Sequence, residues 1–514
     1  MKNIFIILLF FLSTSSFSQT AGLVIKINDK NLLPIIDKEL TSNKLKIIST
    51  DAKLTETFEK YNLYKFKQLY PSSKRPELLK YYLVEAERSE ELIKELIEDH
   101  SDKFSQIREY QEPKPLYIPN DYDFSITHGS DGYTASRDIG LSYLELINAP
   151  EAWEITKGDP NVIMGIHDTH LYVDHEDFAG KIFKVYDANI RSSFYPISGC
   201  DHGTMVAGII AANTNNDTGF SSIGFNCKIA KTSENHDDLL LMAIEGVKVI
   251  NISQDWGPYF EPHAILMEEL TEDYNVTVVA AAGNENSTRY FYPASYENVI
   301  SVTSVGHEFD RGTTFSGKQF NWKDCHRKFI DSSLYPDKTH SHNDKVDICA
   351  PGYYILTTCH PETYRNGLGV PTGQLYSVEE GTSFAAPMVS GVCALMYSIN
   401  PNLTPLEVKD IIQSTAVNIY AIPENAEYIG LLGAGRIDAY EAVKKAGTTY
   451  LTGLQNSKAI SAGYGFILNN VTINNNSNVS LTARKVAEIN GTFEVPLGST
   501  FEIKLDPLAK TIGQ

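Results

Sequence analysis

The chain has 514 residues, of which 42% are hydrophobic and 21% are charged, a composition typical of a globular protein with one large domain and smaller appendages. The formal net charge of −20 argues against nucleic acid or an anionic membrane surface as the main partner, because either would require a basic face. Six cysteines in so long a chain exclude a disulfide-rich scaffold.

Residues 1–18, MKNIFIILLFFLSTSSFS, have the pattern of a secretory signal peptide. Lys2 precedes an apolar run, and serines stand at the −3 and −1 positions before the expected cleavage at Gln19. No other stretch has about 18 uninterrupted apolar residues, so we expect no membrane span. The sequence predicts a secreted protein, located outside the cell, at its surface or in the periplasm.

Residues 19–118 predict a small α+β unit. A strand is expected over 80–86, a helix over 89–100 and another strand over 103–111. The following stretch, EPKPLYIPNDYDF, is rich in Pro, Asn and Asp, which is typical of a linker and suits an exposed processing site.

Residues 119–449 form the main predicted domain, because apolar strand-like runs alternate with helix-like runs. These runs are VIMGIHD, DHGTMVAGIIAA, CKIAKT, DDLLLMAIEG, KVINIS, AILMEELTED, VTVVAAA and VISVTSV. Such alternation predicts an α/β fold with a doubly wound, mostly parallel sheet. Residues 450–514 change to short alternating strands broken by Asn and Gly, which indicates a small all-β appendage with the texture of a β-solenoid fragment.

The stretch GIHDTHLYVDHEDF, residues 165–178, crowds three histidines among four carboxylates. Its density would suit a metal site, because zinc favours imidazole and carboxylate ligands. However, Asp168 ends a buried strand, where open α/β sheets hold their active sites, and strand alternation points His167 the other way. We therefore interpret Asp168 as the functional residue and His167, His170 and His175 as loop or surface residues, with a metal site as the alternative.

Three further polar residues are placed at the sheet edge by small neighbours. His202 begins the helix of DHGTMVAGIIAANT, and Ser383 opens the helix of EGTSFAAPMVSGVCALM. A serine there gains from the helix dipole and from exposed backbone N–H groups. Asn284 follows the buried strand of VTVVAAAGNEN.

In the chain order Asp168, His202, Asn284, Ser383, these segments resemble the subtilisin-like serine proteases, the subtilases. HGTMVAG and GTSFAAP are near-complete motifs of that family, and the resemblance covers roughly residues 145–447. It implies a triad in which His202 takes the proton of Ser383 while Asp168 fixes its tautomer, and an oxyanion donor in Asn284. It also implies peptide substrates, a propeptide that assists folding and inhibits, and no cofactor for the chemistry.

The resemblance further implies substrate contacts along two segments. In NISQDWG the candidates are Ser253 and Gly257, and in AAAGN they are Ala281, Ala282 and Gly283. The loop SENHDD after the CKIAKT strand is too short to form the substrate-pairing edge strand that relatives usually build there. Trp256 either roofs the first subsite or packs into the surface.

Two positions bear on local geometry and metal binding. His170 stands where the family usually has glycine, which raises the question of a strained backbone. Relatives often bind calcium between an aspartate and an Asn-rich loop; here Asp177, Asn216 and Asp217 offer hard oxygen ligands. A structural calcium ion is thus one interpretation, and an Asx-rich turn that satisfies its own backbone is the other.

Residues 318–345 lie between two segments that resemble the family, and we interpret them as an insertion. With residues 357–360 they contribute Cys325, His326, His340, His342, Cys359 and His360. A disulfide between Cys325 and Cys359 is the leading interpretation because export favours oxidation, with a zinc site as the alternative. Cys200 and Cys227 flank a helix and are too far apart to pair.

The sequence therefore predicts a monomeric, secreted serine endopeptidase made as a self-processed precursor. A rival hypothesis is a catalytically inactive subtilase scaffold that binds peptides or glycans.

Overall fold

The computed structural model describes residues 22–512, apart from 29–34, 39–44, 49–50, 62, 70–74, 87–88, 111–117, 123–125, 128–133, 136–140, 187–200, 233–234, 308–313, 316–317, 320–322, 327–339 and 364–371. The predicted signal peptide and Cys200 lie outside the described residues. The chain divides into two compact units, Met1–Lys114 and Pro115–Gln514.

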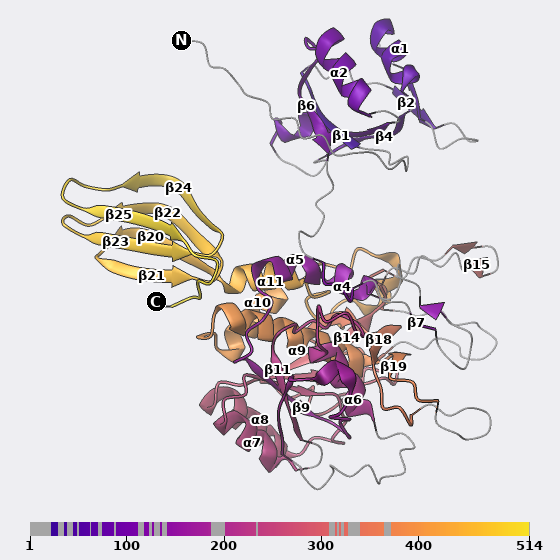
Figure 1. Ribbon diagram of the computed structural model, residues 1–514, viewed down its shortest axis with the longest axis vertical. Helices are drawn as coiled ribbons and strands as arrows, with labels where there is room; N and C mark the ends of the chain where they lie inside the picture. Colours follow the sequence, from indigo (N-terminus) through magenta and orange to yellow (C-terminus); the bar gives the residue numbers. More distant parts are fainter. Residues whose placement is uncertain are drawn as a thin grey trace. The chain divides into compact units, whose positions relative to one another are not determined.

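The N-terminal unit contains a four-stranded antiparallel sheet in the order β4-β5-β1-β6, with two helices on one side of it (Figure 1). Its elements are β1 (Gly22–Ile27), β2 (Ile35–Lys38), β3 (Leu45–Ile48), α1 (Ala52–Lys60), β4 (Leu63–Gln68), η2 (Leu78–Lys80), β5 (Tyr81–Ala86), α2 (Ser89–Asp99) and β6 (Phe104–Tyr110). The predicted strands and helix correspond to β5, α2 and β6. The unit is larger than that fragment, with a core of its own that includes Leu54 and Phe58 of α1.

The larger unit is built on a seven-stranded, wholly parallel sheet in the order β10-β11-β9-β12-β13-β14-β17. Its strands are β9 (Ile163–His167), β10 (Ile182–Val185), β11 (Lys228–Thr232), β12 (Val249–Ile252), β13 (Thr277–Ala281), β14 (Val299–Val305) and β17 (Ile348–Pro351). The helices are α4 (Ser142–Leu146), α5 (Ala149–Ile155), α6 (His202–Ala211), α7 (Asp237–Ile244), α8 (Glu261–Glu268), α9 (Thr382–Ile399), α10 (Pro405–Ser414) and α11 (Ala439–Ala446). Shorter elements are β7 (Ile126–Thr127), β8 (Thr134–Ala135), η3 (Glu176–Phe178), η5 (Glu269–Asp273), β15 (Thr314–Phe315), β16 (Lys318–Gln319), β18 (Ile355–Thr358), β19 (Tyr376–Glu379) and η6 (Pro423–Tyr428).

Alternation along the strands divides the core into two layers, one on each face of the sheet. Met164 and Ile166 of β9 pack with α6 and α9, whereas Ile163 packs with α7 and α8. In β12, Val249 and Ile250 divide in the same way. This arrangement confirms the predicted doubly wound fold, with its helices on both faces (Figure 1).

Helix α9 is the central helix of this unit and is buried along its whole length. Of the described helices, it is the one long and apolar enough to cross a membrane, but complete burial identifies it as a core helix. The apolar composition of α9 is explained by its burial in the core. Its N-terminus lies at the carboxyl edge of the sheet, where Ser383 occupies the second helical position.

The C-terminal strands form two parallel three-stranded sheets, β20-β22-β24 and β21-β23-β25 (Figure 1). They are β20 (Thr448–Gln455), β21 (Lys458–Ala462), β22 (Gly465–Ile473), β23 (Asn478–Ala483), β24 (Val486–Glu494) and β25 (Thr500–Leu505). Alternate side chains such as Phe466, Leu468 and Leu481 fill a small core between them. Strands that alternate between two parallel sheets have the winding of a β-solenoid, as the sequence texture indicated.

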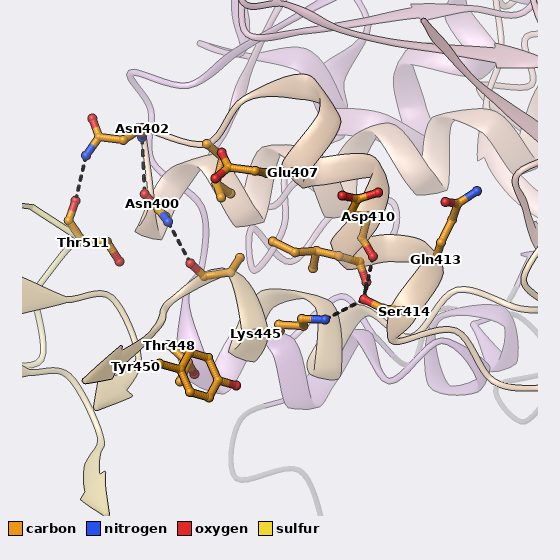
Figure 2. Close-up of a pocket in the computed structure, with 13 residues that line it drawn as sticks. Asn400, Asn402, Glu407, Asp410, Gln413, Ser414, Lys445, Thr448, Tyr450 and Thr511 are labelled. Atoms are coloured by element: carbon orange, nitrogen blue, oxygen red, sulfur yellow. Dashed lines mark hydrogen bonds between the residues drawn. The ribbon is translucent and has the colours of Figure 1, made fainter. Parts of the chain in front are cut away.

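A cavity of about 700 Å³ lies where β20 meets the C-terminal end of α9 and the helices α10 and α11 (Figure 2). Its polar side chains are largely engaged within the protein. Asn400 Nδ2 donates to the Ala446 carbonyl at 2.9 Å, and Lys445 Nζ donates to Ser414 Oγ at 2.6 Å. Asn402 Nδ2 donates to the carbonyl of Thr511 beyond β25 at 3.2 Å. The lining thus connects the β appendage to the helices.

Candidate active site

Asp168 and His202 meet at the carboxyl edge of the sheet. Asp168 follows β9 and is fully buried, and His202 is the first residue of α6. Asp168 Oδ1 accepts a hydrogen bond from His202 Nδ1 at 2.8 Å and another from the Thr169 backbone N–H at 2.7 Å. Because the carboxylate holds the proton on Nδ1, His202 Nε2 carries the lone pair needed by a general base.

The pKa of His202 is raised above its ordinary value of 6.5. Burial lowers it, but attraction to the Asp168 carboxylate and the hydrogen bond to it outweigh that effect, with smaller contributions from Asp201 and Glu379. The imidazolium is therefore stabilised where it would form during proton transfer.

Asp201, immediately before His202, is a buried carboxylate that anchors a neighbouring loop. Its Oδ2 accepts a hydrogen bond from the His360 backbone N–H at 3.1 Å and another from the Thr363 hydroxyl. The Asp201 carboxylate thus holds the 360–363 loop beside α6. It also adds negative charge near the His202 imidazole.

Ser383 lies at the N-terminus of α9 and is 9% exposed. Its Oγ donates to the Ser253 carbonyl at 3.4 Å, and Ser253 Oγ in turn donates to the Ser383 carbonyl at 2.9 Å. The ring of the next residue, Phe384, packs 5.5 Å from that of His202. The serine and the histidine thus share one small region, with the hydroxyl hydrogen directed at Ser253.

Asn284 is tied to the residue that precedes Ser383. Asn284 Oδ1 accepts hydrogen bonds from the Thr382 backbone N–H at 2.8 Å and from its Oγ1 at 3.0 Å. Its Nδ2 has no hydrogen-bond partner in the described part of the chain, and the side chain is exposed. The amide therefore has two N–H donors available beside Ser383.

Glycines around these residues permit close contacts. A Cβ on Gly203 would lie 2.5 Å from the Thr169 carbonyl oxygen, which would push α6 away from the Asp168 loop. Gly283, beside Asn284, has φ +105°, and a Cβ there would meet the Phe291 ring at 2.6 Å.

The predicted substrate-contact residues line the same edge. Ser253 follows β12, whereas Ala281 and Ala282 end or follow β13. Gly257 has φ +85° and faces open space. The Gly283 N–H donates to Thr382 Oγ1 at 3.1 Å, and its carbonyl accepts from the Ser341 N–H at 2.9 Å. Both backbone groups of Gly283 thus have protein partners.

Trp256 packs into a cluster of three histidines on this side of the site. Its ring stacks on His236 at 4.1 Å and contacts His263 at 4.9 Å and His167 at 5.3 Å. His167 Nδ1 also bonds to Gln254 Oε1 at 3.0 Å, and burial lowers the pKa of His167 to about 4. Of the two roles considered for Trp256, packing is the one the contacts support.

The two other histidines of the 165–178 stretch pack into the loop after β9. His170 does not have positive φ, so the replacement of the usual glycine causes no left-handed strain. Its ring lies 6.0 Å from that of His360. His175 uses both ring nitrogens: Nε2 donates to the Leu375 carbonyl at 2.8 Å, and Nδ1 accepts from the Asp177 N–H at 3.1 Å.

Asp177 and the Asn-rich loop form a buried polar site. Asp177 Oδ1 accepts from Asn216 Nδ2 at 2.9 Å, but its Oδ2 is buried without a hydrogen-bond partner among the described residues. Burial raises the pKa of Asp177 to about 7. Asp121, also buried, accepts from the Asn216 N–H at 3.2 Å. Two neighbouring buried carboxylates, one with an orphaned oxygen, fit a hard divalent cation such as calcium.

The predicted Cys325–Cys359 disulfide is wrong. Cys359 carries a free thiol, whose Sγ lies 3.3 Å from the Gln374 carbonyl, while Cys325 Sγ lies 3.6 Å from the Lys323 carbonyl. Spacing alone could not show that the chain brings each thiol to a different carbonyl. In the described residues no group of three His, Cys, Asp or Glu side chains is placed to hold a metal ion.

Three contacts were not predicted from the sequence. The motif GTSFAAP includes Thr382 but does not indicate that it bonds to Asn284, and Asp121 lies in the Pro- and Asn-rich stretch that predicts a linker. Asp201 stands directly before His202, and its carboxylate charge at a helix start was the available signal. The contacts of Thr382 with Asn284 and of Asp121 with Asn216 join residues far apart in the sequence, so no local pattern indicates them.

A model of the subtilase family, peptidase family S8, matches residues 159–466. Thermitase of Thermoactinomyces vulgaris is 30% identical over 333 residues, covering 61% of this chain and 99% of that protein. The halolysin-like extracellular serine protease Nep of Natrialba magadii is 30% identical over 315 residues, covering 58% of this chain and 50% of the relative. A calcium-dependent protease of Nostoc sp. is 29% identical over 339 residues, covering 58% of this chain and 48% of that protein.

The chain thus spans about half the length of the Natrialba and Nostoc relatives and nearly all of thermitase. The match of the family model covers more than half of the chain and includes every candidate catalytic residue. Together with the parallel sheet and the residues at its carboxyl edge, these similarities establish that the chain belongs to the subtilase family of serine proteases.

Proposed function

We propose that this chain is a secreted serine endopeptidase that hydrolyses peptide bonds with Asp168, His202 and Ser383 as its triad and Asn284 as an oxyanion donor. The observation that carries the proposal is the 2.8 Å hydrogen bond from His202 Nδ1 to the fully buried Asp168. It leaves the basic nitrogen of the imidazole for the serine hydroxyl.

In the first step, Ser383 Oγ attacks the scissile carbonyl while His202 Nε2 accepts its proton. The hydroxyl must first turn from the Ser253 carbonyl toward the imidazole, a rotation about one side-chain bond. The Asp168 carboxylate stabilises the imidazolium that forms. His202 then gives the proton to the leaving amine, and a water molecule repeats the sequence to release the acyl group from Ser383.

The negative charge that develops on the carbonyl oxygen is stabilised by donors at the same edge. Asn284 Nδ2 is suited to this role because its Oδ1 is already held by Thr382. The N-terminus of α9 adds backbone N–H groups and the positive end of a helix dipole beside Ser383. These donors are fixed before the reaction, so little reorganisation is required.

The substrate backbone is proposed to lie along Ser253 and Gly257 on one side and Ala281, Ala282 and Gly283 on the other. The shortness of the 233–238 segment, of which 233 and 234 lie outside the described residues, supports weak recognition of distant substrate residues on this side, and Trp256 stacks on His236 within it at 4.1 Å. We therefore expect the residues nearest the scissile bond to dominate binding.

No cofactor is required for this chemistry, but a structural calcium ion is proposed at Asp177. Asp121 and the side-chain oxygen of Asn216 would complete the protein ligands, the latter after rotation of its amide. When bound, calcium would neutralise the two buried carboxylates and stiffen the 213–219 loop. It takes no part in the hydrolysis.

The protein is proposed to be made as a precursor and to mature by its own activity. Residues 1–18 would direct export, and residues 19–118 would assist folding and inhibit the enzyme until removed. The large parallel sheet supports this, because its contacts join distant parts of the chain and such folds form slowly.

Hydrolysis of unstructured peptides by purified protein tests the proposal. Ser383→Ala should abolish turnover and leave an uncleaved precursor in a host without other proteases. Ser398→Ala, a buried serine at the other end of the same helix, should keep activity. A wild-type protein that binds peptides or glycans without cleaving any peptide would favour the inactive-scaffold hypothesis instead.

A further inference from the structure

The end of the 318–345 insertion runs alongside the loop that carries Asn284. The Ser341 backbone N–H donates to the Gly283 carbonyl at 2.9 Å, and Ser341 Oγ accepts the backbone N–H of Glu285 at 3.3 Å. One residue thus bonds to the backbone on both sides of Asn284.

Two further hydrogen bonds extend the contact along the loop. The His342 N–H donates to the Ser287 carbonyl at 3.0 Å, and Asn343 Nδ2 donates to the Arg289 carbonyl at 3.1 Å. The loop 283–289 and the segment 341–343 therefore form one hydrogen-bonded layer.

Ser341 is itself fixed to the central sheet. It is fully buried, and its carbonyl accepts a hydrogen bond from the hydroxyl of Thr303, in the middle of β14, at 2.5 Å. The preceding His340 stacks on the Tyr353 ring at 4.5 Å. A buried residue anchored to a core strand provides a rigid support for the loop beside it.

The Asn284 loop has a backbone that needs such support. Gly283 has φ +105° and Asn286 has φ +45°, conformations that L residues seldom adopt. The side chain of Asn284 is exposed, and in the part of the chain that the structure describes its hydrogen bonds are to Thr382. Thr382 holds the amide and the Gly283 N–H on the side of α9, and the Glu285 side of the loop must also be held if the amide is to keep its direction toward the carbonyl of the substrate.

We propose that Ser341 is a positioning residue for the oxyanion donor. Its hydroxyl holds the Glu285 N–H and thereby fixes the direction in which Asn284 presents Nδ2 to the reacting carbonyl. This inference rests on the proposed endopeptidase activity and assigns a role to a segment that the family motifs do not include. Ser341 does not touch the substrate and acts through Asn284 alone.

Ser341→Ala tests the proposal, because it removes the hydroxyl and keeps the backbone hydrogen bonds to Gly283 and Thr303. We expect kcat to fall about three- to tenfold, the usual range for one neutral hydrogen bond, with KM changed less than about twofold. A fall confined to kcat marks an interaction made in the transition state.

A double-mutant cycle with Asn284→Ala gives the decisive readout. If Ser341 acts through the amide, Ser341→Ala lowers kcat in the wild-type background but has almost no further effect once Asn284 is alanine. An equal fall in both backgrounds would overturn the proposal, and so would an unchanged kcat in Ser341→Ala.

Ser398→Ala is the matched control, since it also removes a buried serine hydroxyl bonded to the backbone, at the far end of α9. It should lower thermal stability by a similar amount and leave kcat unchanged. If Asn284→Ala itself left kcat unchanged, the proposed function of Asn284 would fail, a result distinct from failure of the Ser341 contact.

Discussion

The backbone N–H of Thr382 donates to Asn284 Oδ1 at 2.8 Å, which links the residue before Ser383 to the amide beside it. The hydrogen bond joins the start of α9 to the loop after β13 and so fixes the position of Asn284 relative to Ser383. It also turns the amide so that Nδ2, rather than Oδ1, is available to an incoming carbonyl. A side chain held in this orientation is ready to donate before any substrate binds.

Asn284→Ala should therefore lower kcat by about a hundred- to a thousandfold with little change in KM, the cost of losing one oxyanion donor in a subtilisin. Asn284→Asp should be at least as damaging, since it places a negative charge where one develops. Steady-state kinetics on a chromogenic peptide measures both. A loss below tenfold in each would mean that other donors suffice.

The acidic limb of the pH–rate profile should follow His202 and lie above pH 6.5, because a raised pKa keeps the base protonated to higher pH. Asp201→Asn removes a neighbouring negative charge, destabilises the imidazolium and should move this limb to lower pH. The comparison is kcat/KM between pH 5 and 9.

Asp174→Asn makes the same change at an exposed position of the loop after β9 and should leave the profile in place. An Asp201→Asn limb at the wild-type pH would show that the charge of Asp201 does not reach His202.

Asp177 should make stability depend on pH and on calcium. Its folded pKa near 7 exceeds the ordinary 3.8, so the stability this group contributes is full below pH 3.8 and is lost as the pH rises to 7. When calcium is removed with a chelator, the ionisation of Asp177 should lower Tm by on the order of 5 °C between pH 5 and pH 8. Added calcium should restore the higher Tm.

Asp177→Asn should remove both dependences in differential scanning calorimetry. Asp273→Asn, at an exposed helix end, should retain them. An identical response to calcium in wild type and Asp177→Asn would place any calcium site elsewhere.

Peptide length should affect turnover only weakly. Extending substrates from two to four residues before the scissile bond should raise kcat/KM less than about tenfold, because the 233–238 segment is too short to supply a strand that pairs with the substrate. A hundredfold rise would mean that another segment supplies the missing strand.

The sequence predicted the parts of the molecule that depend on local pattern. Apolar runs ending in Asp168 and near Asn284 located two strands, and small residues after His202 and Ser383 located two helices that pack closely on the sheet. Because parallel strands share one carboxyl edge, these four residues could be predicted to converge.

The remainder depends on contacts between distant segments, which no local pattern encodes. The Ser341 contact with Gly283 joins residues 58 positions apart, and the Asp121 contact with Asn216 joins residues 95 apart. Cysteine spacing failed for the same reason, since Cys325 and Cys359 bond to separate carbonyls.

Labelling with a fluorophosphonate, which reacts only with an activated serine, tests the central claim most directly. The account predicts one adduct per chain, located by mass spectrometry on Ser383, and its loss in Ser383→Ala and strong suppression in His202→Ala. Correctly folded and processed protein that forms no adduct, or forms it on another serine, would contradict the proposed triad.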